Sequence, residues 1–279
     1  MKRIVLVACL SVGLVAVSSR ASAGPIFLTG HDPDSHTQAG AGHDLLLAGL
    51  TFAVGGAANF NDNTHRILWV ESALPVTGGH LRGSDSLPLL GLTVGQDYDI
   101  VNAAGFATAN LSNYTAIGVA SSFGGMYTSA ELNAMILRSA DIATFINNGG
   151  GLFASAECDT GGACDASNMA LPHGSMYGYL PVAVSSIPPS PPFHVTAFGL
   201  SLGLTDGDVN DPTHNSFGLI GGLTPVDLDS GSPLHATTLA GNVRIDDGGF
   251  TTEAPEPGTL SLLGIGLAGV VRRMRRRKA

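Results

Sequence analysis

Short apolar segments alternate with segments of helical period through the first half of the chain. Residues 26–29, 67–70, 98–101, 115–120 and 152–156 have the length and composition of buried strands. Helices are expected at 35–50, 85–92 and 128–147, and the last has the clearest period, with Leu132, Met135 and Ile142 on one face. Such alternation favours an α/β fold whose open, mostly parallel sheet is covered by helices on both faces.

The boundaries of these elements have local signals. Ser35 and Gln38 have the spacing of a capping box, which predicts that the first helix begins there. Three consecutive glycines, 149–151, are expected to end the 128–147 helix. Residues 185–192 predict an extended Pro-rich loop, 193–198 a strand, and the sequence beyond Gly218 a β-rich C-terminal part. No linker divides residues 24–254, so we expect one exported domain between the terminal segments 1–23 and 255–279.

The cationic residues lie almost entirely at the two ends of the chain. Three precede residue 21 and six lie in the last eight residues. The middle has four Arg, no Lys and all 22 acidic residues, a net charge of −18. Because phosphate contacts from Lys and Arg dominate affinity for nucleic acid, this distribution excludes nucleic acid as a partner.

The N-terminus has the pattern of a secretory signal peptide. Lys2 and Arg3 precede an apolar run, 4–17, and Ala21-Ser22-Ala23 supplies the small residues of a cleavage site. We therefore expect export through the Sec machinery and removal of residues 1–23 by signal peptidase. The residues ending at Cys9 also match a lipoprotein box, but only five apolar residues precede that cysteine.

At the C-terminus, Pro255-Glu256-Pro257 is followed by an apolar segment, 260–271, and then by a cluster of Arg. This order of features resembles a PEP-CTERM sorting signal. The resemblance implies a Gram-negative bacterium that produces extracellular polysaccharide, and an exosortase-type membrane enzyme as the processing partner. It also implies a transient anchor in the inner membrane through a short transmembrane helix, and then release to the cell surface. The apolar segment is shorter than the roughly 20 residues of a usual spanning helix, so a hydrophobic tail is the alternative.

Three segments of the body share a pattern with a known family: 26–31, 114–120 and the helix, glycine turn and strand of 141–156. On these segments the body resembles the class I glutamine amidotransferase-like superfamily, and within it the ThuA-like branch. It implies a flavodoxin-like sheet over about 26–220, with Cys158 or Glu157 at the nucleophile turn and His214 as the triad histidine. Neither Glu157 nor Cys158 is flanked by Gly, and His214 is followed by Asn215-Ser216 where the family has a Glu two places on.

These departures favour a non-catalytic binding or matrix module that associates with extracellular polysaccharide. The alternative is a hydrolytic or metal-dependent enzyme in which Glu157, His31 and His214 act as acid, base or metal ligands beyond the strand ends. A purely structural surface protein is the third class.

The two cysteines of the exported part, Cys158 and Cys164, predict a disulfide. Exported proteins fold in an oxidising compartment, and an even pair six positions apart is readily bridged. The acidic residues nearby, Glu157, Asp159 and Asp165, would raise the pKa of a free thiol, which disfavours a nucleophilic role.

Two polar clusters are candidate sites for a divalent cation, Zn²⁺ or Ca²⁺. His31, Asp34 and His36, with Asp32 between them, follow the first strand, and His43 and Asp44 come one helical segment later; imidazole and carboxylate suit a transition metal. The alternative is that Asp34 and Ser35 cap a helix.

The second cluster begins like an EF-hand loop. Asp206, Asp208 and Asn210 occupy its first, third and fifth positions, but Asp211 replaces the Gly and Phe217 the bidentate Glu. Two interpretations of this segment remain: a looser Ca²⁺ site and a solvated turn.

Overall fold

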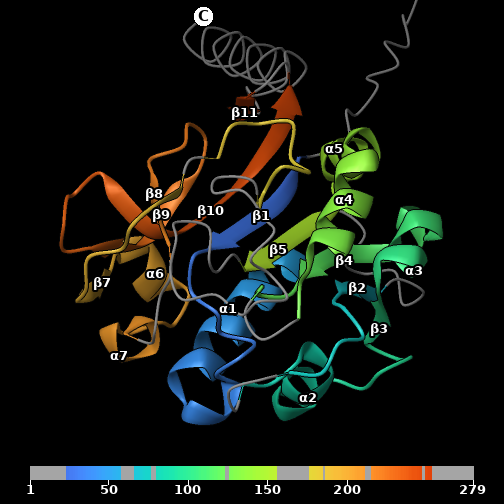
Figure 1. Ribbon diagram of the computed structural model, residues 1–279. Helices are drawn as coiled ribbons and strands as arrows, with labels where there is room; N and C mark the ends of the chain where they lie inside the picture. The colour runs from blue at the N-terminus through green and yellow to red at the C-terminus, as the bar shows by residue number, and fades with distance from the viewer. Residues whose placement is uncertain are drawn as a thin grey trace, which may run out of the picture. The chain divides into compact units, whose positions relative to one another are not determined.

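The computed structural model describes residues 23–57, 66–76, 80–122, 126–155, 176–184, 186–210, 215–246 and 249–252. All of them belong to one unit, Ala21–Glu253. Eleven strands of the described residues form one mixed sheet with helices on both sides, which confirms the α/β class (Figure 1).

The helices and strands follow one another along the chain as expected for the first half. The strands are β1 (Gly24–Thr29), β2 (Arg66–Val70), β3 (Tyr98–Val101), β4 (Tyr114–Val119), β5 (Gly151–Ser155), β6 (Ser186–Ile187), β7 (Phe193–Val195), β8 (Ser216–Gly218), β9 (Thr224–Asp229), β10 (His235–Asp246) and β11 (Gly249–Thr251). The helices are α1 (Ala41–Gly55), α2 (Gly83–Ser86), α3 (Ala103–Thr108), α4 (Ser129–Leu137), α5 (Ser139–Asn147), α6 (Ala197–Ser201) and α7 (Asp206–Val209), with 3₁₀ turns η1 (Thr37–Ala39), η2 (Leu87–Leu90) and η3 (Leu111–Asn113).

The sheet has a parallel half and an antiparallel half that meet at β1. Strands β3, β2, β4, β5 and β1 lie side by side in that order and are parallel. β10 then pairs antiparallel with β1 from Gly24↔Val243 to Thr29↔Thr238, and carries the remaining strands (Figure 1). The prediction of a mostly parallel sheet is therefore correct for the first five strands, and the β-rich C-terminal part extends that same sheet.

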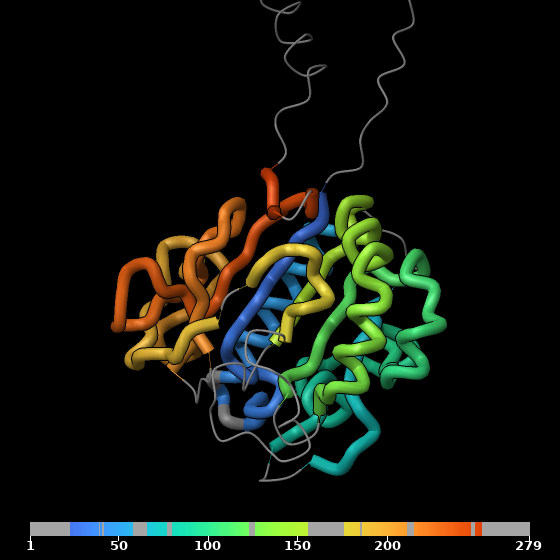
Figure 2. The backbone as a smooth tube through the Cα atoms, turned by 45° about the horizontal axis from the view of Figure 1, so that its top comes forward, coloured from blue at the N-terminus to red at the C-terminus, as the bar shows by residue number. Residues whose placement is uncertain are grey.

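The two faces of the sheet are covered by different helices. α1 packs against β1, β4 and β5 on one face, and α5 packs against β1, β5 and β10 on the other (Figure 2). On the α1 face the ring of Phe153 stacks between those of Phe27 and Trp69, at centroid distances of 5.9 and 6.1 Å. Gly118 on β4 is the register partner of Trp69 and lies between it and Phe153. A Cβ at Gly118 would lie 2.5 Å from the indole, so the absence of a side chain there lets Trp69 reach Phe153.

The first helix begins later than the capping-box spacing predicts. α1 starts at Ala41, after η1 and the left-handed Gly40 at φ 87°. The hydroxyl of Ser35 bonds to that of Ser121, 2.9 Å away just beyond the end of β4, so it does not cap a helix. Tertiary contact thus overrides the local helix signal.

The expected 128–147 helix is two helices, α4 and α5, separated at Arg138. Arg138 leaves the helical region (φ −111°, ψ 20°), and its Nη1 donates to the carbonyls of Phe106 and Ala109 at 2.7 and 2.8 Å. These carbonyls lie at the C-terminal end of α3, where a cation is favourable. The break between α4 and α5 therefore coincides with the contact of Arg138 with the end of α3.

The expected strand at 193–198 ends early. β7 stops at Val195 because Thr196 caps α6, its hydroxyl accepting from the N–H of Gly199 at 3.2 Å. The expected helix at 85–92 is the short α2 followed by η2.

No helix among the described residues has both the length and the apolar character needed to span a membrane. Residues 1–22 of the expected signal peptide, 1–23, and the apolar segment 260–271 lie outside the described residues.

Candidate functional site

Buried polar side chains gather where the parallel strands end. We call this the C-terminal edge of the sheet: the segments that follow β1, β2, β4 and β5. The polar residues buried there to 6% exposure or less include His31, Asp32, Asp34, Ser35, Glu71, Ser72, Ser121, Ser122 and, as the last residue of β5, Ser155. Three of them are carboxylates. A buried charge costs free energy unless it is paired, so burying these three carboxylates lowers the stability of the folded chain.

Asp34 joins three segments at this edge. Its Oδ2 accepts from the backbone N–H of Ser121 at 2.8 Å, and its backbone carbonyl accepts from the hydroxyl of Ser86. Burial raises the pKa of Asp34 to about 6, and the hydrogen bonds from Ser121 oppose that rise. Asp34 thus connects the loop after β1 to β4 and α2.

Glu71, directly after β2, is a second buried carboxyl. Its Oε2 accepts from the indole N–H of Trp69 at 2.9 Å. Burial raises the pKa of Glu71, the hydrogen bonds from Trp69 and Ser84 lower it, and the nearby Asp34 carboxylate raises it further. The two acids therefore disfavour each other's ionisation.

Asp32, His36 and His80 form the one group of metal-ligand side chains found among the described residues. The ligand atoms of the three lie within 4.8 Å of one another. His36 Nε2 is 3.0 Å from Asp32 Oδ2, and the rings of His36 and His80 meet edge to face with centroids 5.1 Å apart. Asp32 is fully buried, whereas the His36 side chain is 23% exposed.

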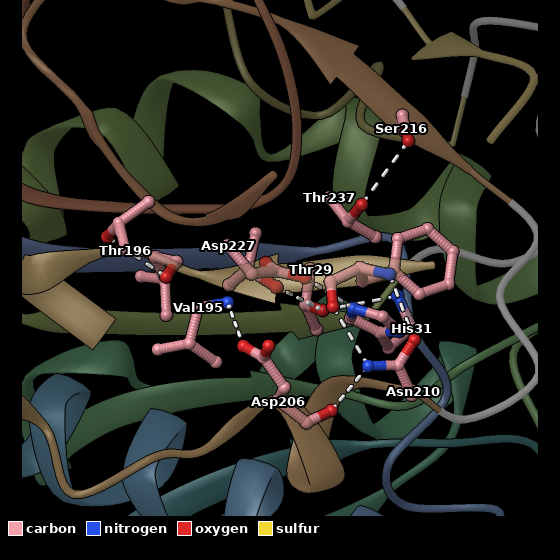
Figure 3. A network of polar contacts seen from close by, with 12 residues as sticks. Thr29, His31, Val195, Thr196, Asp206, Asn210, Ser216, Asp227 and Thr237 are labelled. Atoms are coloured by element: carbon pink, nitrogen blue, oxygen red, sulfur yellow. Dashed lines mark hydrogen bonds and ion pairs between the residues drawn. The ribbon is translucent and has the colours of Figure 1, made fainter. Parts of the chain in front are cut away.

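His31 lies on the other side of β1, against the antiparallel half (Figure 3). Its Nε2 is 2.9 Å from Oδ2 of Asp227 on β9, and both side chains are buried. The ring of Phe193 packs edge-on against the imidazole at 5.2 Å, and the backbone N–H of His31 donates to the hydroxyl of Thr29. Of the expected ligand set His31, Asp34 and His36, the structure therefore brings only His36 into the metal-ligand group.

The expected Ca²⁺ ligands have structural partners within the protein (Figure 3). Asp206 accepts from the N–H of Val195 at 2.8 Å and pairs with His194, which together lower its pKa. Asp208 accepts from the N–H and hydroxyl of Thr205, closing a capping box on α7. Asn210 exchanges two hydrogen bonds with the backbone of Phe193. These contacts tie α7 to β7, and Ca²⁺ binding there stays a prediction.

Several expected residues lie outside the described residues. They are Ala21 of the cleavage site, the catalytic candidates Glu157, Cys158 and His214, the disulfide partner Cys164, and the sorting residues Pro255, Glu256 and Pro257. The disulfide and the hydrolytic alternative therefore stay predictions. Ala23, at the expected cleavage site, is buried directly before β1.

His80 and Glu71 are polar residues of this edge that the sequence patterns did not single out. His80 is 44 positions from His36 and belongs to no motif. The available signal for Glu71 was its place immediately after an apolar strand, where the side chains of an open α/β sheet meet ligands.

One hollow among the described residues lies elsewhere. A depression of about 440 Å³ is lined by residues that include Asn110, Arg138 and Gly150, at the opposite ends of β4 and β5. It contains one arginine and one aspartate, which are engaged with each other at 2.9 Å. The group of metal-ligand side chains found among the described residues therefore lies at the C-terminal edge and not in this hollow.

Comparison with known proteins identifies one segment. Residues 253–277 match the PEP-CTERM protein-sorting motif. The motif implies export, an exosortase as the processing partner and sorting to the cell surface. No curated protein matches the chain.

Proposed function

We propose that this chain is an exported protein, trimmed at both ends, whose α/β body serves on the cell surface as a non-catalytic binding module. In this proposal the chain is exported through the Sec machinery, and signal peptidase removes its N-terminal segment. An exosortase then processes its C-terminus, and the body associates with extracellular polysaccharide. β1 begins at Gly24, immediately after the expected cleavage site, and β11 ends at Thr251, before the sorting motif. Both cuts therefore leave every described strand intact.

The observation that carries the binding role is the burial of polar groups at the C-terminal edge. Ligands of open α/β sheets bind beyond the carboxyl ends of the strands. Asp34 and Glu71 are held there with raised pKa values, although an apolar edge would be cheaper to bury. Polar groups kept at a cost in stability are the mark of a site retained for function.

Ser155 offers a direct test of that cost. It ends β5 beside Thr29, its hydroxyl is buried, and that oxygen has no hydrogen-bond partner among the described residues. We expect Ser155→Ala to raise the free energy of unfolding by up to about 1 kcal/mol, because an unsatisfied buried hydroxyl is removed. Urea denaturation of the purified protein at neutral pH measures it.

Ser216→Ala is the matched control. Ser216 is also a fully buried strand serine, but its hydroxyl bonds to that of Thr237 at 3.3 Å. We expect Ser216→Ala to lower the free energy of unfolding by about 0.5–1.5 kcal/mol, because a buried hydrogen bond is lost. If Ser155→Ala were destabilising to the same extent, Ser155 would serve the fold, and the proposed site at this edge would lose its support.

A further inference from the structure

The loop after β1 and the segment before α2 are joined so that three metal-ligand side chains converge. The Leu81 N–H donates to the carbonyl of Ser35 at 3.1 Å, and the hydroxyl of Ser86 donates to that of Asp34. These bonds hold residue 80 alongside residues 34–36. Within the loop, the Ser35 N–H donates to the carbonyl of Asp32 at 2.9 Å, which turns the chain and places His36 over Asp32.

We propose that Asp32, His36 and His80 bind a divalent transition-metal ion of the Zn²⁺ class. This inference rests on the proposed function, since it names the ligand class of the same edge. With metal–ligand bonds of about 2.0–2.2 Å in tetrahedral geometry, two ligand atoms of one ion lie roughly 3.3–3.6 Å apart. The Asp32–His36 distance of 3.0 Å is slightly shorter than that spacing. All three ligand atoms lie within 4.8 Å of one another, so side-chain movements of about 1 Å complete the set.

The burial of the site distinguishes it from ordinary surface pairs of His and Asp. His43–Asp44 and His194–Asp206 have similar distances, 2.8 and 3.1 Å, but every side chain in them is at least 36% exposed. Neither pair belongs to a three-residue group among the described residues. Asp32, by contrast, is fully buried, and a cation bound to its carboxylate would offset the cost of burying that charge.

The donor set selects the class of metal. Two imidazoles and one carboxylate suit Zn²⁺ and its first-row neighbours, whereas Ca²⁺ and Mg²⁺ prefer sets made wholly of oxygen. Three protein ligands leave a fourth position open, and the partial exposure of His36 gives that position access to solvent or to a ligand group.

The test uses the purified full-length chain, stripped with a chelator and equilibrated with Zn²⁺, with bound metal measured by mass spectrometry. We expect one Zn²⁺ per chain at this site and at least a tenfold loss of affinity in His80→Ala and in Asp32→Asn. His194→Ala, which disrupts an exposed pair, is the matched control and should bind as the parent does. Co²⁺ serves as a spectroscopic probe, whose d–d bands should change in His80→Ala and persist in His194→Ala.

His80 is only partly buried, so His80→Ala is expected to fold, and circular dichroism of the metal-free variants checks this. Failure to retain Zn²⁺ at micromolar concentration, or unchanged affinity in both His80→Ala and Asp32→Asn, would overturn the inference. The outcome is separate from that of Ser155→Ala. If Ser155→Ala is stabilising and no metal binds, the metal site fails and the binding module stands; if both tests fail, both proposals fail.

Discussion

Glu71 shows how a single buried carboxyl links stability to pH. Its side chain is 4% exposed and accepts from Trp69, and burial raises its pKa above the ordinary value of 4.5. The folded state therefore holds this proton at a pH where the unfolded chain has released it. It follows that the contribution of Glu71 to stability is most favourable below about pH 4.5 and is lost as pH rises through the folded pKa.

We predict that Glu71→Gln stabilises the protein at pH 8 relative to the parent, and that the advantage disappears at pH 4. Gln keeps an oxygen that can accept from the Trp69 indole but never ionises. Denaturation curves at the two pH values measure the difference. A difference between parent and variant that is independent of pH would show that Glu71 ionises as readily in the folded state as in the unfolded chain.

The candidate site was only partly predictable at the level of residues. The sequence placed a polar cluster after the first strand, and the structure has His36 in the metal-ligand group. Nearby residues of that cluster, however, contact three different parts of the chain: His31 contacts β9, Asp34 the segment after β4, and His36 the ring of His80. The turn of the loop decides these directions, and residue spacing does not report it.

At the level of elements, the strands were predicted well and the helix ends less well. β3 has the expected bounds, and β1, β2, β4 and β5 differ from expectation by one or two residues at their ends. Parallel buried strands are short continuous apolar runs, which a local pattern identifies. The helix boundaries moved where a side chain preferred a distant partner, as Ser35 does with Ser121 and Arg138 with the end of α3.

Gly118 supplies a test of the packing between strands. We expect Gly118→Ala to destabilise by about 1–3 kcal/mol, because its Cβ would lie 2.5 Å from Trp69 and force the indole to move. Trp69 is the one tryptophan in the sequence, so its fluorescence emission reports the movement directly.

Gly218→Ala is the control for that substitution. Gly218 also lies in a strand, β8, but a Cβ there would meet nothing within 4 Å. We expect little change in stability and none in the emission of Trp69. If the two variants behaved alike, the close approach of Trp69 to β4 would not matter to the fold.

For the whole molecule, the sorting motif predicts how the chain is processed. Replacing Pro255, Glu256 and Pro257 together by Ala is expected to leave the C-terminal segment attached and the protein in the membrane fraction. The parent should yield a shorter surface form that begins at Gly24. Mass spectrometry of each fraction measures both ends.

Thr259 lies beyond the Pro-Glu-Pro residues. Thr259→Ala is therefore the control and should be processed as the parent is. This experiment requires a host that contains the exosortase. Release of the triple variant at the parental rate would mean that another feature of the C-terminus directs sorting.

The sequence by itself determined the C-terminal sorting motif, the α/β class and the first five strands, because each depends on a contiguous run of residues; the signal peptide stays a prediction of the same kind. Only the tertiary structure decided that the later strands extend the same sheet through β10, that His31 meets Asp227 196 positions away, and that His80 joins Asp32 and His36. The physical reason is that such contacts depend on register and on the path of loops between distant segments. Local periodicity does not encode either of them.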